Sequence, residues 1–335
     1  MIKCIFTIDY EIYGNGQGSL KELVYDPMER LLAIFRKHQT GFVVFVEVAE
    51  LEMLEAKGTD SAINLVKQQL RNFYSEGFEL GLHLHPQWYN ARHEKGKWLL
   101  DYNEYNLCAL PKERIVQIVD RSIAYFRDLL GVADFIPLSF RAGNWLFQPT
   151  QTVANVLVEQ GIKVDSSVFK GGLQHQHKLD YRRALKNGHY WRFFDDVNVP
   201  TPRGALLELP IHTQMVPFWR MLTSKRIALQ RKGNSTDQTN KNQTGKKKLY
   251  RLMDFLRLWH PLKFDFCRMT INELTRMVDT VIKEDQRDPT SFRPIVAIGH
   301  TKDLIDFQTV ESLLSYLEQQ KIKVTTFKEV YPKFK

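Results

Sequence analysis

Two histidines spaced two residues apart, His83 and His85, close the apolar run that begins at Glu79. Side chains two apart on a β-strand project to the same face, so both imidazoles would reach one metal ion. Asp9 and Glu11 have the same spacing at the end of an apolar run near the N-terminus. Carboxylates at one strand end and imidazoles at another predict a metal-binding or acid–base site.

Each of these motifs also has a structural interpretation when it is taken alone. A carboxylate pair after a strand often caps a helix or lies on the surface. Two histidines beside Pro86 and Trp88 can pack as imidazoles bonded to carbonyl groups. Arg141 can belong to a structural ion pair. The functional interpretation therefore depends on whether the motifs lie together in the fold.

The elements that would position these residues follow an alternating pattern. Apolar runs alternate with segments of helix length, which is typical of repeated β–α units. The pattern predicts strands near 3–8, 41–46, 78–82, 138–140, 163–164, 206–209, 295–298 and 323–326. It predicts helices near 27–38, 62–76, 112–130, 150–160, 271–284 and 310–320. Seven or eight such strands favour an α/β fold with a (β/α)7–8 barrel rather than an open sheet.

The candidate side chains share one position relative to this pattern. In parallel barrels the chemistry lies at the C-terminal ends of the strands. Eight side chains fall at or just after the predicted strand ends, namely Asp9, Glu11, His83, His85, Arg141, Asp165, His212 and His300. This shared placement is stronger support for a site than any single residue.

Length and composition are those of a globular protein. A chain of 335 residues with 43% hydrophobic residues can bury a full core, and we expect a single barrel domain over residues 1–335. No run reaches the 18 apolar residues of a membrane span. The N-terminus enters the first predicted strand at once, so we expect no cleavable signal peptide. Three widely spaced cysteines indicate neither disulfides nor a zinc ribbon, which favours a cytoplasmic protein.

The positive charge is confined to one predicted insertion, at about 216–263. Residues 219–263 contain 12 Lys or Arg and only two Asp, whereas the whole chain has a net charge of +9. Residues 233–245 are polar throughout and are predicted to be a disordered loop. The flanking stretches are basic, with apolar residues at helical spacing. They can cover the barrel or contact an anionic membrane at its inner face, and no nucleic-acid motif accompanies them.

With the strand ends in view, the chain resembles the polysaccharide deacetylase family, whose members have the NodB-like distorted barrel. Five segments in family order carry the resemblance: Thr7–Glu11, Gly81–Pro86, Phe140–Asn144, Val164–Ser167 and Ile298–His300. Two positions differ from the usual pattern. Tyr10 separates the two acids, and Gln87 stands where the second histidine is usual. Either His85 replaces that ligand, or the metal is lost or bound differently.

The resemblance implies a role for each residue. Asp9 would be the general base, oriented by Arg141 and tuned by Asp165, and His300 would be the general acid. Glu11, His83 and His85, with Asp9 as a further candidate, would hold a divalent metal, for which we expect Zn²⁺. The expected sugar contacts are Trp88, Asn144, Trp145 and His212.

The activity that we expect is metal-dependent removal of an N-acetyl group from an amino sugar. The substrate would be an N-acetylated sugar or a lipid-linked glycan used in O-antigen or capsule synthesis. Two alternatives remain open at this point: hydrolysis of a small non-sugar amide, and an inactive barrel that binds glycan without turnover.

Overall fold

The computed structural model describes residues 1–186, 188–223, 225–227 and 257–334. Its centre is a nine-stranded sheet in the order β10-β11-β7-β6-β3-β2-β1-β14, with β15 also paired to β1. All pairs in this sheet are parallel except β10 with β11. The strands are β1 (Ile2–Tyr10), β2 (Val43–Glu47), β3 (Glu79–Leu84), β6 (Ser139–Ala142), β7 (Val164–Asp165), β10 (Trp191–Phe193), β11 (Leu206–Glu208), β14 (Arg293–His300) and β15 (Lys323–Thr325).

The sheet curls so that its two ends meet. Ile211, just after β11, forms a parallel bridge with Val296 of β14, and the amide of His212 donates to Val296 O at 2.9 Å. The chain thus adopts the predicted distorted barrel. All eight predicted strands are present, and each lies within three residues of its expected bounds.

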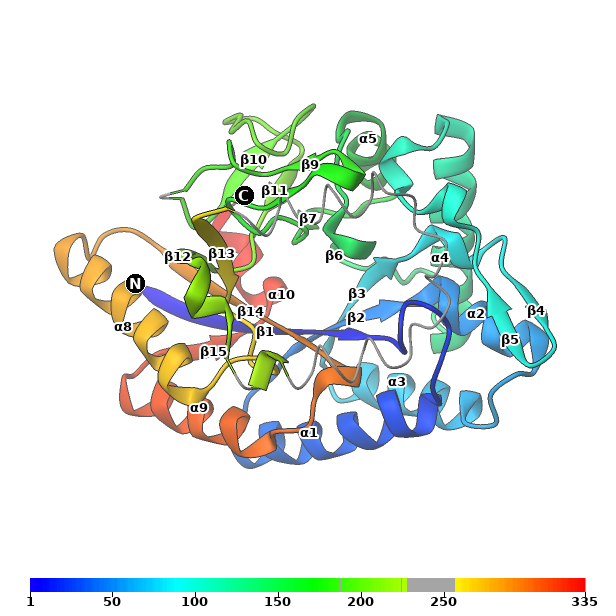
Figure 1. Ribbon diagram of the computed structural model, residues 1–335, viewed down its shortest axis with the longest axis horizontal. Coiled ribbons are helices and arrows are strands. Elements are labelled where there is room, and N and C mark those ends of the chain that lie inside the picture. The colour runs from blue at the N-terminus through cyan, green and yellow to red at the C-terminus, as the bar shows by residue number, and fades with distance from the viewer. Residues whose placement is uncertain (187, 224, 228–256, 335) are drawn as a thin grey trace.

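Helices surround this sheet (Figure 1). They are α1 (Asp26–Lys37), α2 (Val48–Lys57), α3 (Ile63–Ser75), α4 (Lys112–Leu130), α5 (Gln151–Glu159), α8 (Ile271–Arg287), α9 (Phe307–Gln319) and α10 (Phe327–Val330). The six predicted helices are all observed. Helix α2 escapes prediction because it is buried on most of its surface and so lacks an amphipathic stripe. No helix in these ranges is long and apolar enough to cross a membrane.

Alternation along β1 separates two cores. Cys4, Phe6 and Ile8 pack in the core between the sheet and the helices, whereas Ile5 packs in a second, inner core. Helix α10 contributes Phe327 and Val330 to that inner core. By the period of two, Thr7 and Asp9 share the inner face with Ile5. The strand therefore delivers its polar residues into the barrel at its C-terminal end.

Three smaller two-stranded sheets lie outside the barrel: β4 (Arg92–Glu94) with β5 (Lys97–Leu99), β8 (Leu173–Gln174) with β9 (Leu179–Asp180), and β12 (Thr213–Pro217) with β13 (Trp259–Lys263). The sequence showed helical spacing of apolar residues in the basic segment. At both ends of that segment the structure instead has strands, β12 and β13. The predicted disordered loop, 233–245, lies outside the described residues.

The N-cap of α9 provides a test of local stability. Asp306 accepts hydrogen bonds from the amide and hydroxyl of Thr309 at 3.0 and 2.6 Å, and from Lys225 Nζ at 2.9 Å. Burial opposes ionisation of Asp306, but these donors lower its pKa to about 2. The unfolded value is about 3.9. Ionised Asp306 therefore stabilises the fold above about pH 4, and this contribution is lost as the pH falls towards 2.

We predict that Asp306→Ala lowers the free energy of unfolding by about 1 kcal/mol at pH 7, the usual cost of losing a cap. The difference from wild type should shrink as the pH falls from 5 to 3. Urea unfolding at each pH measures it. Asp306→Asn, which keeps a capping oxygen, should lose less at pH 7. An Ala effect that does not change with pH would show that the charge is unimportant.

Candidate metal and hydrolytic site

Strand register brings the predicted polar residues together at one end of the barrel. Asp9 on β1 lies directly beside His300 on β14. His83 on β3 lies between Glu47 on β2 and Arg141 on β6. All five residues are buried, and their side chains meet inside the barrel mouth.

A buried ion pair joins Asp9 to Arg141. Arg141 Nη1 donates to Asp9 Oδ1 at 2.6 Å, and Nη2 donates to Thr7 Oγ1 at 2.9 Å. Nε donates to the backbone oxygen of Ser166 at 2.9 Å, so the guanidinium is bonded on several sides. Burial alone would raise the pKa of Asp9, but the charges of Arg141 and of two nearby imidazoles outweigh it and lower that pKa. Asp9 is therefore a carboxylate.

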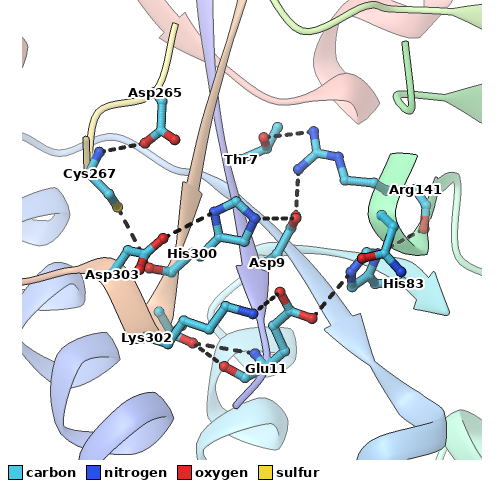
Figure 2. A network of polar contacts seen from close by, with 12 residues as sticks. Thr7, Asp9, Glu11, His83, Arg141, Asp265, Cys267, His300, Lys302 and Asp303 are labelled. Carbon is cyan, nitrogen blue, oxygen red and sulfur yellow. Dashed lines mark hydrogen bonds and ion pairs between the residues drawn. The ribbon is translucent and has the colours of Figure 1, made fainter. Parts of the chain in front are cut away.

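His300 faces the second oxygen of Asp9. Its Nε2 lies 3.4 Å from Asp9 Oδ2, and its Nδ1 lies 4.0 Å from Asp303 Oδ2 (Figure 2). Within the described chain, Nδ1 has no hydrogen-bond partner. Burial lowers the pKa of His300 although Asp9 opposes the shift, so the imidazole is neutral near pH 7. Asp9 and His300 are placed to pass a proton between them.

Glu11 contacts the two histidines through one carboxylate oxygen and Lys302 through the other. Its Oε2 lies 3.2 Å from His85 Nε2 and 3.6 Å from His83 Nε2, and its Oε1 accepts from Lys302 Nζ at 2.7 Å. Burial would raise the pKa of Glu11, but Lys302 and the imidazoles lower it well below its usual range. Glu11 is thus an ionised carboxylate held against the two imidazoles. Figure 2 shows it between Lys302 and His83.

Contacts at Nδ1 orient both imidazole rings. His83 Nδ1 lies 2.8 Å from Arg141 O, so Nδ1–H donates and Nε2 is left to face Glu11. His85 Nδ1 contacts the side-chain amides of Gln87 and Asn144 at 3.1 and 3.2 Å. Gln87 Oε1 is buried without a partner in the described chain. In this arrangement both amide nitrogens donate to Nδ1, so Nε2 carries the ring proton towards Glu11. Turning both amides so that their oxygens face Nδ1–H would leave His85 Nε2 free for a metal.

Glu47 completes this group, and sequence reasoning missed it. Ligand atoms of Glu11, Glu47, His83 and His85, here named the Glu–His cluster, all lie within 4.8 Å of one another. Glu47 Oε2 is buried and has no hydrogen-bond partner among the described residues. Burial, with Glu50 and Glu11 nearby, raises the pKa of Glu47 well above its usual value. A divalent cation would remove that cost, and two carboxylates with two imidazoles suit Zn²⁺ or a similar metal.

The signal for Glu47 was available in the sequence. The residue ends the run Val43–Glu47 just as Asp9 and the histidines end theirs. The predicted strand stopped at Val46, one residue too early. A smaller group, Asp9, Glu11 and His300, also has ligand atoms within 4.8 Å, so Asp9 remains a further candidate ligand.

Asp165, the residue predicted to tune the Asp9–Arg141 pair, makes its side-chain hydrogen bonds to other groups. It accepts from the hydroxyl and amide of Ser167 at 2.7 and 3.1 Å, and its side chain also contacts that of Glu208 on β11. Burial raises the pKa of both carboxyl groups. Arg141 influences Asp165 only through its charge. Asp165 and Glu208 therefore form a buried acid pair below the site.

The predicted sugar contacts divide into three cases. Trp88 is only 1% exposed and packs against Trp98, so it has no face for a sugar. The side-chain amide of Asn144 contacts His85 Nδ1 at 3.2 Å. Trp145 is partly exposed and its ring lies perpendicular to that of His300, with 6.1 Å between ring centres.

His212 lies in a different cavity. It stacks on His189, with 6.1 Å between ring centres, and borders a cavity that also contains Lys170 and Arg293. Arg293 is the first residue of β14, so this cavity extends towards the opposite end of the strand from His300. The structure does not bring His212 to the predicted site. The prediction failed because His212 lies beside the middle of β14, where its amide donates to Val296 O, and not beside the C-terminal end of that strand.

The fold is shared with known hydrolases. No family model matches the chain, and no curated protein matches it in sequence. A polysaccharide deacetylase described as putative, from Mycobacterium smegmatis, is similar in structure, with a TM-score of 0.53, 13% identity, and coverage of 99% of this chain and 90% of that one. The structure of Puue allantoinase is also similar, with a TM-score of 0.50 at 12% identity. The match covers 98% of this chain and 88% of that one.

A GH57 branching enzyme from Thermococcus kodakaraensis gives a TM-score of 0.55 at 11% identity, covering 99% of this chain and 71% of that one. These likenesses establish that the chain has the fold of the polysaccharide deacetylases. Because enzymes of other specificities share it, the function has to be argued from the site.

The Glu–His cluster makes a testable prediction about metal affinity. Glu47→Gln keeps the shape of the side chain but removes the charge and one ligand oxygen, so we expect Zn²⁺ affinity to fall at least tenfold. Competition with a chromogenic chelator measures it. Glu50→Gln is the matched control, because Glu50 is equally buried but accepts from the Ile12 amide at 2.9 Å. Equal losses in both variants would exclude Glu47 as a ligand.

Proposed function

We propose that this protein is a metal-dependent hydrolase that removes the N-acetyl group from an amino sugar. The proposal depends on two groups of side chains that lie together at the C-terminal ends of the barrel strands. One is the Glu–His cluster, and the other is the series of contacts from Arg141 through Asp9 to His300. The first supplies metal ligands, and the second supplies groups that move protons. Hydrolysis of an unactivated amide needs both.

The residues of the site suit the proposed metal. The buried, unpartnered Glu47 Oε2 and the Nδ1 contact that fixes His83 Nε2 are features expected of ligands. A divalent ion held by the Glu–His cluster would polarise the acetyl carbonyl and acidify an attacking water. Glu11, already ionised beside Lys302, needs no proton removed before it binds.

The protons are handled by Asp9 and His300. Asp9 is ionised because Arg141 holds its other oxygen, so Oδ2 can accept a proton from the attacking water. His300 is neutral at rest and can receive that proton from Asp9 across 3.4 Å. It then donates the proton to the departing amine. This order gives His300 the role of general acid although its resting form is unprotonated.

The surroundings of the site favour a sugar over a small amide. Trp145 and Phe169 line a cavity of about 330 Å³ that adjoins His300 through Trp145, and a cavity of this size can hold a sugar ring. The two alternatives are an allantoinase-like hydrolase of a small amide and a barrel that binds glycan without turnover. Acetate release from a panel of N-acetylhexosamines, with and without chelator, separates them. No release from metal-loaded protein would refute the enzyme proposal.

The proposed context is synthesis of a surface polysaccharide such as O-antigen or capsule, on a free or lipid-linked precursor in the cytoplasm. The three cysteines, Cys4, Cys108 and Cys267, are all unpaired and buried, which supports a reducing compartment.

Contact with the inner face of the membrane is part of the same proposal. Four large apolar side chains cluster where β12 and β13 meet the basic segment and are 50–73% exposed: Trp219, Leu222, Leu258 and Trp259. The amide of Phe218 donates to Leu258 O at 3.2 Å, which joins the two strands at this point. Exposed aromatic residues next to basic ones are typical of interfacial attachment.

Substitutions at the site should separate the proposed roles. Asp9→Asn should keep most of the metal but lower kcat at least a hundredfold, because the base is lost. His83→Ala should lose metal and activity together. His300→Ala should keep metal and lower kcat, since protonation of the amine fails. Metal content and acetate release measure both properties. Full activity of Asp9→Asn at saturating metal would contradict the assignment of the base.

Membrane contact has its own test. The protein should co-sediment with vesicles containing anionic lipid at low salt and should dissociate as salt rises, because screening weakens attraction of about 1 kcal/mol per basic residue. Replacing Trp219 and Trp259 with Ser should weaken this binding. Leu99→Ser, a similarly exposed residue on β5, should not. Equal binding to neutral and anionic vesicles would rule out the electrostatic attachment.

A further inference from the structure

The cavity beside His300 has an unusual charge. Its lining includes four basic side chains, Arg226, Arg257, Lys263 and Arg268, but only one acid, Asp265, among the described residues. The aromatic rings of Trp145 and Phe169 form part of its wall. A cavity with this lining attracts a ligand that combines an apolar face with a negative charge.

Most of these charges are already satisfied within the protein. Arg226 pairs with Glu273 at 2.6 Å, and Arg268 Nε donates to Asp303 at 2.8 Å. Asp265 Oδ1 accepts the amides of Cys267 and Arg268, both at 3.0 Å. Arg257 Nη2 donates to Gly171 O at 3.2 Å. These contacts leave one of the four cations to be explained.

Lys263 is that cation. It is the last residue of β13, and its ammonium lies 3.3 Å from the centre of the Trp145 ring and 4.7 Å from that of Phe169. No carboxylate of the described chain lies within ion-pair distance of it. Desolvation by burial lowers the pKa of Lys263 to about 7. An anion in the cavity would remove this cost and keep the ammonium charged.

A second group in the cavity also lacks a partner. His260, three residues before Lys263 on the same strand, has a buried Nε2 with no hydrogen bond to any described residue. His260 and Lys263 both border the cavity. Both are groups that bind carboxylate or phosphate oxygens.

The cavity adjoins the proposed site of hydrolysis. Trp145 is shared, since its ring lies perpendicular to that of His300 and also carries the Lys263 ammonium over its face. Asp265, two residues after Lys263, bridges to Ile298 on β14, which ends at His300. A sugar whose acetamido group lies at His300 would therefore have its other substituents near Lys263.

We propose that the substrate is an N-acetylated amino sugar that carries a negatively charged group, a carboxylate or a phosphate, and that Lys263 binds this group. The inference rests on the proposed function and adds the class of sugar. An uncharged sugar would leave Lys263 without an anionic partner, and its cation–π contact with Trp145 would be its only strong interaction.

The test compares three probes that differ in charge: N-acetylglucosamine, its 6-carboxylate (the uronic acid) and its 1-phosphate. Wild-type protein should hydrolyse at least one charged probe with a kcat/KM at least tenfold above that of the neutral sugar. The probe that gains this advantage distinguishes carboxylate from phosphate. Lys263→Met should raise KM for that probe at least tenfold, with a smaller change in kcat, and Lys263→Arg should restore part of the loss.

Lys283→Met is the matched control, because Lys283 is exposed on α8 away from the cavity and should keep the wild-type preference. Calorimetry with the Asp9→Asn variant separates the two levels of the argument. Binding of a charged probe that depends on Lys263, without acetate release by wild type, would refute the proposed function but support the anionic ligand. Acetate release with equal kcat/KM for neutral and charged probes, unchanged by Lys263→Met, would overturn the inference.

Discussion

The buried pair of Arg141 and Asp9 constrains the rest of the structure. A guanidinium removed from water is strongly destabilising unless its donors are satisfied, and here its partners come from β1 and from the residue that follows β7. A shift of one residue in β1 would turn Asp9 to the outer face and leave Arg141 unpaired. The pair thus favours the strand register that also places Glu11 against the histidines.

The charge of the site is balanced before any ligand arrives. Glu11 is shared between Lys302 on one oxygen and the two imidazoles on the other. Glu47, with one buried and unpartnered oxygen, is the group left to gain most from a cation. Lys302 therefore keeps Glu11 ionised and in place, while Glu47 supplies the affinity that a second carboxylate brings. Asp9 and His300 lie outside the Glu–His cluster, so they are available for the proposed proton transfer even when the cluster holds a metal.

Much of this arrangement was predictable because the sequence indicates where each strand begins and where its C-terminal end lies. Eight apolar runs predicted the barrel, and the Asp, His or Arg residues that follow several of them marked the C-terminal ends of the strands. Three-dimensional partners were not predictable in the same way. Asp165 meets Glu208 from another strand, and Trp88 is enclosed by Trp98 from a hairpin. His212 lies at the seam where Ile211 meets β14, and no local pattern reveals which side of a seam a residue faces. Glu47 was missed by one residue of strand length.

The positions of β12 and β13 have an evolutionary consequence. The groups that move protons and hold the cluster come from barrel strands and the residues directly after them, whereas Lys263 and His260 come from a strand pair inserted between β11 and α8. The groups proposed for recognition and those proposed for catalysis are therefore encoded in separate stretches of the gene. Mutation or replacement of the inserted stretch can change which sugar is accepted without disturbing the reacting centre. This separation would let one barrel fold serve several ligands over evolution.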